Sequence, residues 1–135
     1  MGMENFVKKV FEGEKEVHPS VECLSIFNNS FPKAAGMEWF DRKDFLEVIF
    51  YEEGMEHIAR LKKEGSLIDY RKFLPEGYLP ESIKNSFSPA REIMNVVLIN
   101  RGNTIEYEVI SRDEHLVRYL TILTDLGRTV RESTL

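Results

Sequence analysis

Histidines are the residues of this chain best suited to proton transfer or metal binding, and there are three of them. His18 stands before Pro19 at the start of a helix-like pattern, His57 lies within a strand-like pattern, and His115 opens another. No two histidines have the i, i+4 spacing of a helical zinc site, and no cysteine accompanies them at ligand spacing. We therefore predict no metal site and expect the histidines to have structural or surface roles.

Carboxylates offer the other acid–base chemistry, and Glu106 and Glu108 are the pair with the most informative spacing. On a strand, their side chains share one face and are separated by about 7 Å. A pocket that raised the pKa of one of them would make the pair a general acid and base. Their alternation with Tyr107 also fits a solvated sheet face, and we favour this interpretation.

The candidate nucleophiles lack activating surroundings. Cys23 is the single cysteine, so no disulfide can form within the chain, and its sequence neighbours provide no electropositive setting. The serines lack a nucleophile elbow, and Gly102 lies in a turn without the several glycines of a phosphate-binding loop. The sequence therefore predicts no catalytic residue, no cofactor and no enzymatic activity.

Composition and charge exclude further classes of protein. The chain has 135 residues, a formal net charge of −5 and a hydrophobic content of 42%, which fit a small globular fold. Nucleic-acid binding is not expected, because basic residues cluster only in pairs. Membrane insertion is not expected either, because no apolar run approaches about 18 residues. Residues 1–17 lack the apolar core of a signal peptide, which indicates either a cytoplasmic chain or a trimmed one.

The periodicity of apolar residues predicts the elements of the first half. Helical spacing occurs within residues 1–16 and again after Pro19, which suits the first turn of a helix, while Pro32 limits that helix. The pattern then changes to the alternation typical of strands. We place these strands at residues 37–40, 45–51, 55–62 and 66–70.

The same order of elements starts again in the second half. A break over residues 74–77 is followed by Pro80 and a short helix marked by Ile83 and Phe87. Gly102 and Asn103 indicate a tight hairpin turn. Strand patterns lie at residues 93–100, 104–112, 115–124 and 128–131.

A nearly constant offset relates the two halves. Pro19 and Pro80 are 61 positions apart, as are Glu47 and Glu108 in their strands, and Gly65 and Gly127 are 62 apart. Such an offset is typical of a tandem repeat, although chance similarity of two short stretches is the alternative. We therefore predict an α+β fold in which two tandem helix-plus-antiparallel-sheet repeats form one larger sheet with helices on one face. The predicted divisions of this compact domain are an N-terminal extension at 1–16, a first repeat at 17–77 and a second repeat at 78–135.

The repeated pattern carries a set of residues in a characteristic order: Pro19, Val21, Phe27, Phe31-Pro32, Ala34-Ala35, Met37-Glu38-Trp39, 46–50, Gly65, Leu79-Pro80, Tyr107-Glu108-Val109 and Gly127. In this order and spacing the chain resembles the PepSY-like, beta-lactamase-inhibitor-like family. The resemblance implies tandem units of one helix on an antiparallel sheet, and a periplasmic location. It also implies, for relatives named for beta-lactamase inhibition, that the open face of the sheet binds an enzyme. The chain departs from the family in its N-terminal segment, in its lack of a visible export signal and in its lack of paired cysteines.

Strand alternation divides the sheet residues between two faces. If helices cover the face that carries Leu46, Val48, Phe50, Tyr107 and Val109, the residues between them form a second, open face. This second face combines aromatic, aliphatic and charged side chains, which is typical of a recognition surface. Its predicted members are Phe45, Glu47, Ile49, Tyr51, Glu106, Glu108, Ile110 and Arg112.

The sequence therefore predicts a non-catalytic, inhibitor-like module that binds a protein or peptide through the second face. The alternative is a structural or self-associating domain, in which a second copy of the chain or the N-terminal segment covers that face. An enzyme is least favoured, since it would need a deep pocket lined by convergent polar groups.

Overall fold

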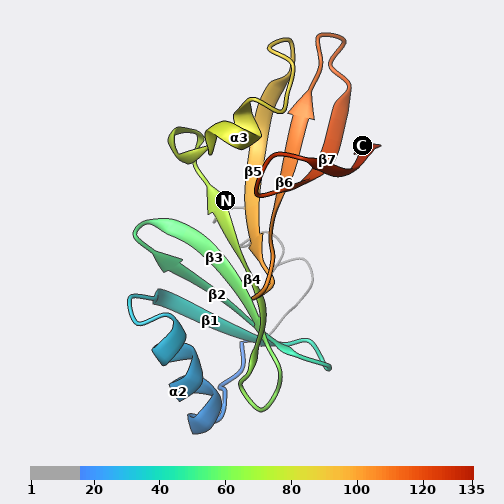
Figure 1. Cartoon of the computed structure of the whole chain (residues 1–135). Helices are drawn as coiled ribbons and strands as arrows, with labels where there is room; N and C mark the ends of the chain where they lie inside the picture. The colour runs from blue at the N-terminus through green and yellow to red at the C-terminus, as the bar shows by residue number, and fades with distance from the viewer. Residues whose placement is uncertain (1–15) are drawn as a thin grey trace. The chain divides into compact units, whose positions relative to one another are not determined.

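A computed structural model of the protein describes residues 16–135, and its strands form an eight-stranded sheet in the order β1-β2-β3-β4-β5-β6-β7-β8 (Figure 1). This arrangement confirms the predicted α+β class and the predicted larger antiparallel sheet. The helix predicted within residues 1–16 lies, apart from Glu16, outside the described residues. In chain order the elements are α2 (Val21–Ser30), β1 (Ala35–Asp41), β2 (Leu46–Glu52), β3 (Met55–Leu61), β4 (Leu67–Leu74), the 3-10 helix η1 (Glu76–Tyr78), α3 (Glu81–Lys84), β5 (Glu92–Asn100), β6 (Ile105–Arg112), β7 (Arg118–Thr124) and β8 (Thr129–Thr134).

Internal contacts divide the chain into two units, of which the first ends at Tyr70 and the second begins at Arg71. The division falls within β4, several residues before the boundary predicted between residues 77 and 78. The division into two repeats stays a prediction.

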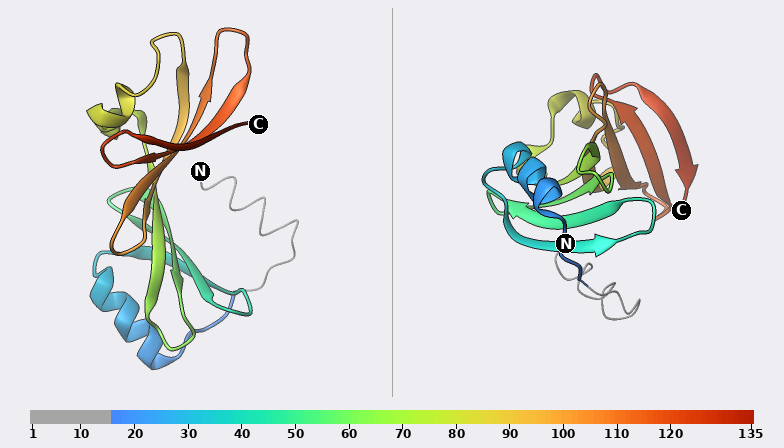
Figure 2. Two further views of the ribbon diagram at one scale, coloured as in Figure 1. Left: turned by 45° about the vertical axis from the view of Figure 1, so that its right-hand side comes forward. Right: turned by 90° about the horizontal axis from the view of Figure 1, so that it is seen from below.

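The first unit is built around α2, which lies along one face of its strands (Figures 1 and 2). The hydroxyl of Ser20 caps the helix by accepting a hydrogen bond from the Cys23 amide at 3.1 Å. The helix buries Cys23 and Phe27, and the Phe27 ring lies 5.1 Å from that of Phe50 and 5.2 Å from that of Trp39. An aromatic cluster of this kind buries a large apolar area. The buried core of the first unit comprises Cys23, Phe27, Phe31, Trp39, Leu46, Val48, Phe50, Ala59 and Leu61.

The second unit has a smaller core and a shorter helix. Its helix α3 has four residues, against ten for α2, and buries one side chain, Ile83. Proline at residue 80 stands at the N-cap position without a side-chain hydrogen bond. The core comprises Ile83, Val96, Tyr107, Val109 and Leu123.

Corresponding strand pairs in the two units join residues that the predicted offset relates. In the first unit Leu46 faces Leu61 and Phe50 faces His57. Adding 61 to the β2 residues and 62 to the β3 residues gives residues of β6 and β7 that also face each other. Tyr107 faces Leu123, and Ser111 faces Tyr119.

Some predicted boundaries were wrong. β7 begins at Arg118, so His115 lies in the preceding turn rather than in a strand. The Asp113 carboxylate accepts hydrogen bonds from the His115 and Val117 amides at 2.9 and 3.0 Å, and this local bonding holds the turn. β4 continues to Leu74, beyond the predicted end at residue 70.

Candidate functional site

The second face of the first unit carries Phe45, just before β2, and Glu47 within it. Phe45 is half-buried, and the guanidinium carbon of Arg60 lies 5.2 Å from the centre of its ring. Glu47 accepts a hydrogen bond of 2.6 Å from Arg42, which follows β1. Both predicted residues are therefore on the surface and are held in place by arginines.

Ile49 and Tyr51 follow on the same face but differ in accessibility. The side chain of Tyr51 is 38% exposed, and its hydroxyl donates to Glu56 across the β2–β3 pair at 3.4 Å. Ile49 is 7% exposed, so the expectation that it would be open to a partner was wrong. Strand alternation determines the face of a side chain but not what covers it, which is why Ile49 was misjudged.

An ion pair with one buried partner on this face was missed by sequence reasoning. Asp69 of β4 is 2% exposed and accepts a 2.8 Å hydrogen bond from Nε of Arg60, and a second nitrogen of the same guanidinium contacts its other oxygen. This hydrogen bonding raises the pKa of Arg60 above its ordinary value, against the opposing effect of burial. The two residues are nine positions apart, and nothing in their sequence spacing predicts their contact.

The predicted charged residues of the second unit all have ionic partners. Glu106 lies 3.3 Å from Nε of Arg101, and Glu108 lies 3.5 Å from a guanidinium nitrogen of Arg71. At the far end of β6, Arg112 donates to Glu92 at 2.5 Å. Side chains paired in this way have less freedom to lose when a partner binds.

A hollow of about 460 Å³ brings Glu106 and Glu108 together on this face. We call it the arginine hollow, because Arg71, Arg101 and Arg131 line it beside the two glutamates. Its apolar lining is formed by Ile99, Ile122 and Val130. Of the other predicted residues, Ile110 is half-buried, and both it and Arg112 lie outside the hollow.

Of the residues that line the hollow, Glu106 and Glu108 were predicted, and Arg131 is among those that sequence reasoning missed. It lies on β8, directly opposite Ile122 of β7, and Ile122 in turn lies opposite Glu108 of β6. Its side chain is exposed and makes no ion pair or hydrogen bond within residues 16–135. Its place in the hollow depends on the register of three strands, and no local signal reveals that register.

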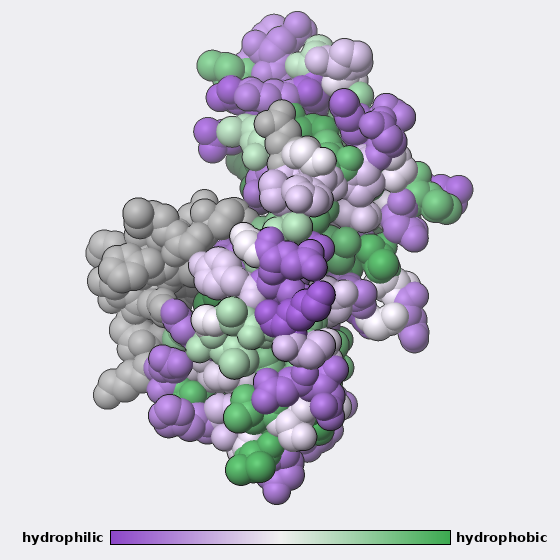
Figure 3. All heavy atoms as spheres, turned by 90° about the vertical axis from the view of Figure 1, so that its left-hand side faces the viewer, coloured by the Kyte–Doolittle hydropathy of each residue, from purple (hydrophilic) through white to green (hydrophobic). Residues whose placement is uncertain are grey.

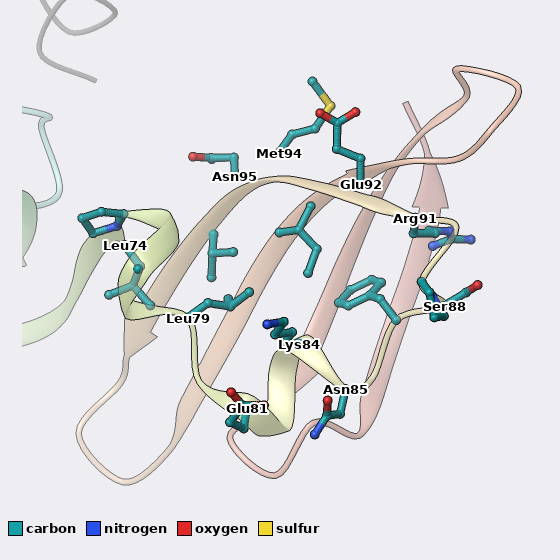
Figure 4. A pocket seen from close by; sticks show the side chains of 16 residues that line it. Leu74, Leu79, Glu81, Lys84, Asn85, Ser88, Arg91, Glu92, Met94 and Asn95 are labelled. Atoms are coloured by element: carbon teal, nitrogen blue, oxygen red, sulfur yellow. The ribbon is translucent and has the colours of Figure 1, made fainter.

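A second hollow, of about 890 Å³, lies beside α3 (Figure 4). Leu74, Leu79 and Phe87 contribute apolar lining. In the close view Glu92, Met94 and Asn95 project from β5 on the side away from α3. The hollow lies at the edge of the small core of the second unit, which the four-residue helix leaves partly uncovered.

Of the three histidines, His57 is the buried one, and its Nε2 lies 3.9 Å from a carboxylate oxygen of Glu52. His57 is 3% exposed, stacks on Phe50 with ring centres 5.0 Å apart, and has Nδ1 2.9 Å from the Met55 carbonyl oxygen. Within residues 16–135, no cluster of three or more His, Cys, Asp or Glu side chains is arranged to hold a metal ion. In the same part of the chain, no helix has the length and apolar character needed to cross a membrane.

The surface shown in Figure 3 mixes hydrophilic and hydrophobic side chains over both units. Among the residues coloured in that view, hydrophobic side chains are interspersed with hydrophilic ones. A mixed surface of this kind is compatible with a non-obligate protein interface, which is about as polar as the rest of a protein's surface.

Comparison with known proteins finds similarity in structure only. No family model and no curated protein matches the chain. A DUF2874 family protein from Bacteroides ovatus superposes with a TM-score of 0.75 at 17% identity, covering 87% of this chain and 89% of the other. A BLIP-like protein from Bacteroides fragilis gives a TM-score of 0.76 at 14% identity, covering 88% of each chain. A "putative periplasmic" protein from Bacteroides eggerthii gives a TM-score of 0.75 at 14% identity, covering 87% of this chain and 90% of the other.

These similarities define the class of fold. The chain shares its α+β antiparallel-sheet fold with DUF2874 family proteins and with a protein that resembles a beta-lactamase inhibitor protein. TM-scores of 0.75 and 0.76 show a common fold. At sequence identities of 17 and 14%, a common fold carries no activity from one protein to another. The resemblance to PepSY-like repeats stays a prediction.

Proposed function

We propose that this chain is a non-catalytic, inhibitor-like module that binds a protein or peptide through the second face of its strands. The observation that carries the proposal is that the predicted charged residues of this face are held by ionic partners. Glu47 is paired with Arg42, Glu106 with Arg101, and Glu108 with Arg71. Charged groups that are already oriented favour selective association with a complementary surface.

Aromatic side chains supply the apolar anchors that such a surface needs. Tyr51 is 38% exposed and Phe45 is half-buried beneath Arg60. Tyrosine is enriched among the residues that dominate binding energy, because it offers a large contact area with few rotatable bonds. Tyr51 is therefore the residue of the first unit that we expect to contribute most to binding.

The similarity to a BLIP-like protein supports the inhibitor-like part of this proposal, with an enzyme as the partner and no reaction performed by the chain itself. The similarity to a chain named as periplasmic supports action in that compartment.

The test begins with a partner isolated by crosslinking and continues with titration of defined variants. Tyr51→Ala should weaken binding by about 2 kcal/mol, or roughly 30-fold in Kd, as expected for an interface anchor. Tyr78→Ala is the matched control, because Tyr78 is 63% exposed in η1 and belongs to no predicted site. Unchanged affinity for both Tyr51→Ala and Glu108→Ala, with circular dichroism showing an intact fold, would contradict the proposal.

Self-association is the second candidate function, and one observation favours it. β8 is the last strand in the sheet order, and all six of its residues are exposed. A bare strand edge can pair with another chain. Sedimentation equilibrium of the full chain separates the two functions, since a stable dimer that resists Tyr51→Ala but dissociates on Val130→Lys would favour self-association.

A further inference from the structure

We propose that the arginine hollow of the second unit receives a carboxylate side chain of the partner, and that Arg131 pairs with it. This inference rests on the proposed function and adds a chemical class of ligand to it. The site lies wholly within the second unit, on strands β4 to β8.

Arg131 is available because Glu108 pairs with an arginine on its other side. Glu108 and Arg131 lie on β6 and β8, and Ile122 of β7 stands between them. Arg71 of β4 also lies two strands from Glu108, across β5. Glu108 instead pairs with Arg71 on its other side, at 3.5 Å.

The charges of the hollow favour a single negative group. Arg71 is opposed by Glu108 and Arg101 by Glu106, at 3.5 and 3.3 Å, so the charge of Arg131 is left without a counterion in the hollow. One carboxylate would balance it. A phosphate group or a nucleic acid would bring further negative charge against two glutamates and a chain of net charge −5.

The apolar lining of the hollow would strengthen this contact. Ile99 and Ile122 are 2% and 9% exposed, while Val130 on the rim is 58% exposed. A partner residue next to the carboxylate can bury apolar surface against Val130 and so exclude water from the ion pair. Charges interact more strongly where water is excluded, and guanidinium–carboxylate pairs gain further from two parallel hydrogen bonds.

The experiment titrates the full, isotope-labelled chain with two peptides, acetyl-Leu-Glu-Leu-amide and its Gln counterpart, followed by NMR. We expect the Glu peptide to shift the Arg131 Nε signal and the methyl signals of Ile122 and Val130. We expect the Gln peptide to bind about tenfold more weakly, since it cannot form a charge-assisted pair. Added salt should weaken binding of the Glu peptide alone.

Variants locate the effect. Arg131→Gln should reduce the affinity for the Glu peptide to that of the Gln peptide. Arg128→Gln is the matched control, since Arg128 is an exposed arginine of the turn before β8 and does not line the hollow. It should leave both affinities unchanged.

Three results would overturn the inference. They are equal binding of the two peptides at the hollow, binding of the Glu peptide that survives Arg131→Gln, and no shift at the hollow with either peptide. None of them decides the proposed function, because that rests on the partner titration with Tyr51→Ala and Glu108→Ala. Conversely, unchanged affinity of the partner for both of these variants, together with a positive peptide titration, would contradict the proposed function and leave the carboxylate site in place.

Discussion

Gly127 lies so close to Ser82 that a Cβ atom added at residue 127 would stand 2.3 Å from the Ser82 carbonyl oxygen. The Ser86 hydroxyl lies 2.6 Å from the Gly127 carbonyl oxygen, so the turn after β7 is bonded directly to the region of α3. The first unit has a comparable approach, where a Cβ at Gly65 would stand 3.1 Å from Cα of Cys23 in α2. In each unit, a glycine turn allows the helix to pack closely against the sheet.

Gly127→Ala should therefore destabilise the protein strongly. The residue has φ +84°, and its neighbour is backbone that cannot move aside as a side chain would. We expect a loss of about 3 kcal/mol in the free energy of unfolding, combining the left-handed backbone with the steric clash. Gly102→Ala is the control, with φ +90° and no atom within 4 Å, and should lose only about 1 kcal/mol. Urea denaturation measures both, and equal losses would show that the close approach contributes nothing.

Ser111→Ala should stabilise the protein. Ser111 is 0% exposed, and its hydroxyl has no hydrogen-bond partner within residues 16–135. Replacing an unsatisfied buried hydroxyl by a methyl group should raise the free energy of unfolding by about 1 kcal/mol. Ser133→Ala, at an exposed position of β8, should change it little. A fall in melting temperature for Ser111→Ala would mean that the hydroxyl has a favourable partner after all.

Glu132 should make stability depend on pH. Its carboxylate accepts hydrogen bonds from Arg91 at 3.0 and 3.2 Å and from the Thr121 hydroxyl at 2.7 Å. The hydrogen bonds from Arg91 and then from Thr121 lower the pKa of Glu132 below its ordinary value of 4.5. A lowered pKa in the folded state means that the stabilisation is complete above pH 4.5 and is lost as the pH falls through the folded-state pKa.

Glu132→Gln is the variant that checks this dependence. At pH 7 it should lose about 1 kcal/mol, a value already discounted for the partial exposure of the pair. The difference from the unsubstituted protein should shrink as the pH is lowered below 4.5. Glu114→Gln, whose side chain is 73% exposed, should show no such convergence. Parallel curves of unfolding free energy against pH for Glu132→Gln and the unsubstituted protein would contradict the assignment.

Removing either partner of the Arg60–Asp69 pair should have unequal effects. Arg60→Ala leaves the carboxylate of Asp69, which is 2% exposed, as a buried charge without this partner and should lose about 3 kcal/mol. Asp69→Ala leaves a guanidinium that is 32% exposed and can turn toward water, so it should lose less. Chemical denaturation of both single variants and the double variant gives the coupling between them. A larger loss for Asp69→Ala would contradict this account.

Local signals in the sequence were sufficient for much of the fold. Pro19 before an apolar pattern indicated α2, and strict alternation indicated β2 and β6, because helices and strands repeat their side chains with periods of 3.6 and 2. The offset between the halves relates the facing residues of β2 and β3 to those of β6 and β7, but no pairing was predicted from it. The faces of Tyr51, Glu106 and Glu108 followed from the same alternation.

Other features depend on residues that only folding brings together. Three such features are the burial of Ile49, the pairing of Arg60 with Asp69, and the hollow beside α3. Each arises between different elements, and the spacing of the residues in the sequence does not predict it. The clearest case is Arg131, which nothing in its local sequence distinguishes from Arg128. Periodicity determines the face on which a side chain lies. The neighbours that cover or pair with it are decided by the register of adjoining strands and the length of a helix, which the tertiary structure sets through packing.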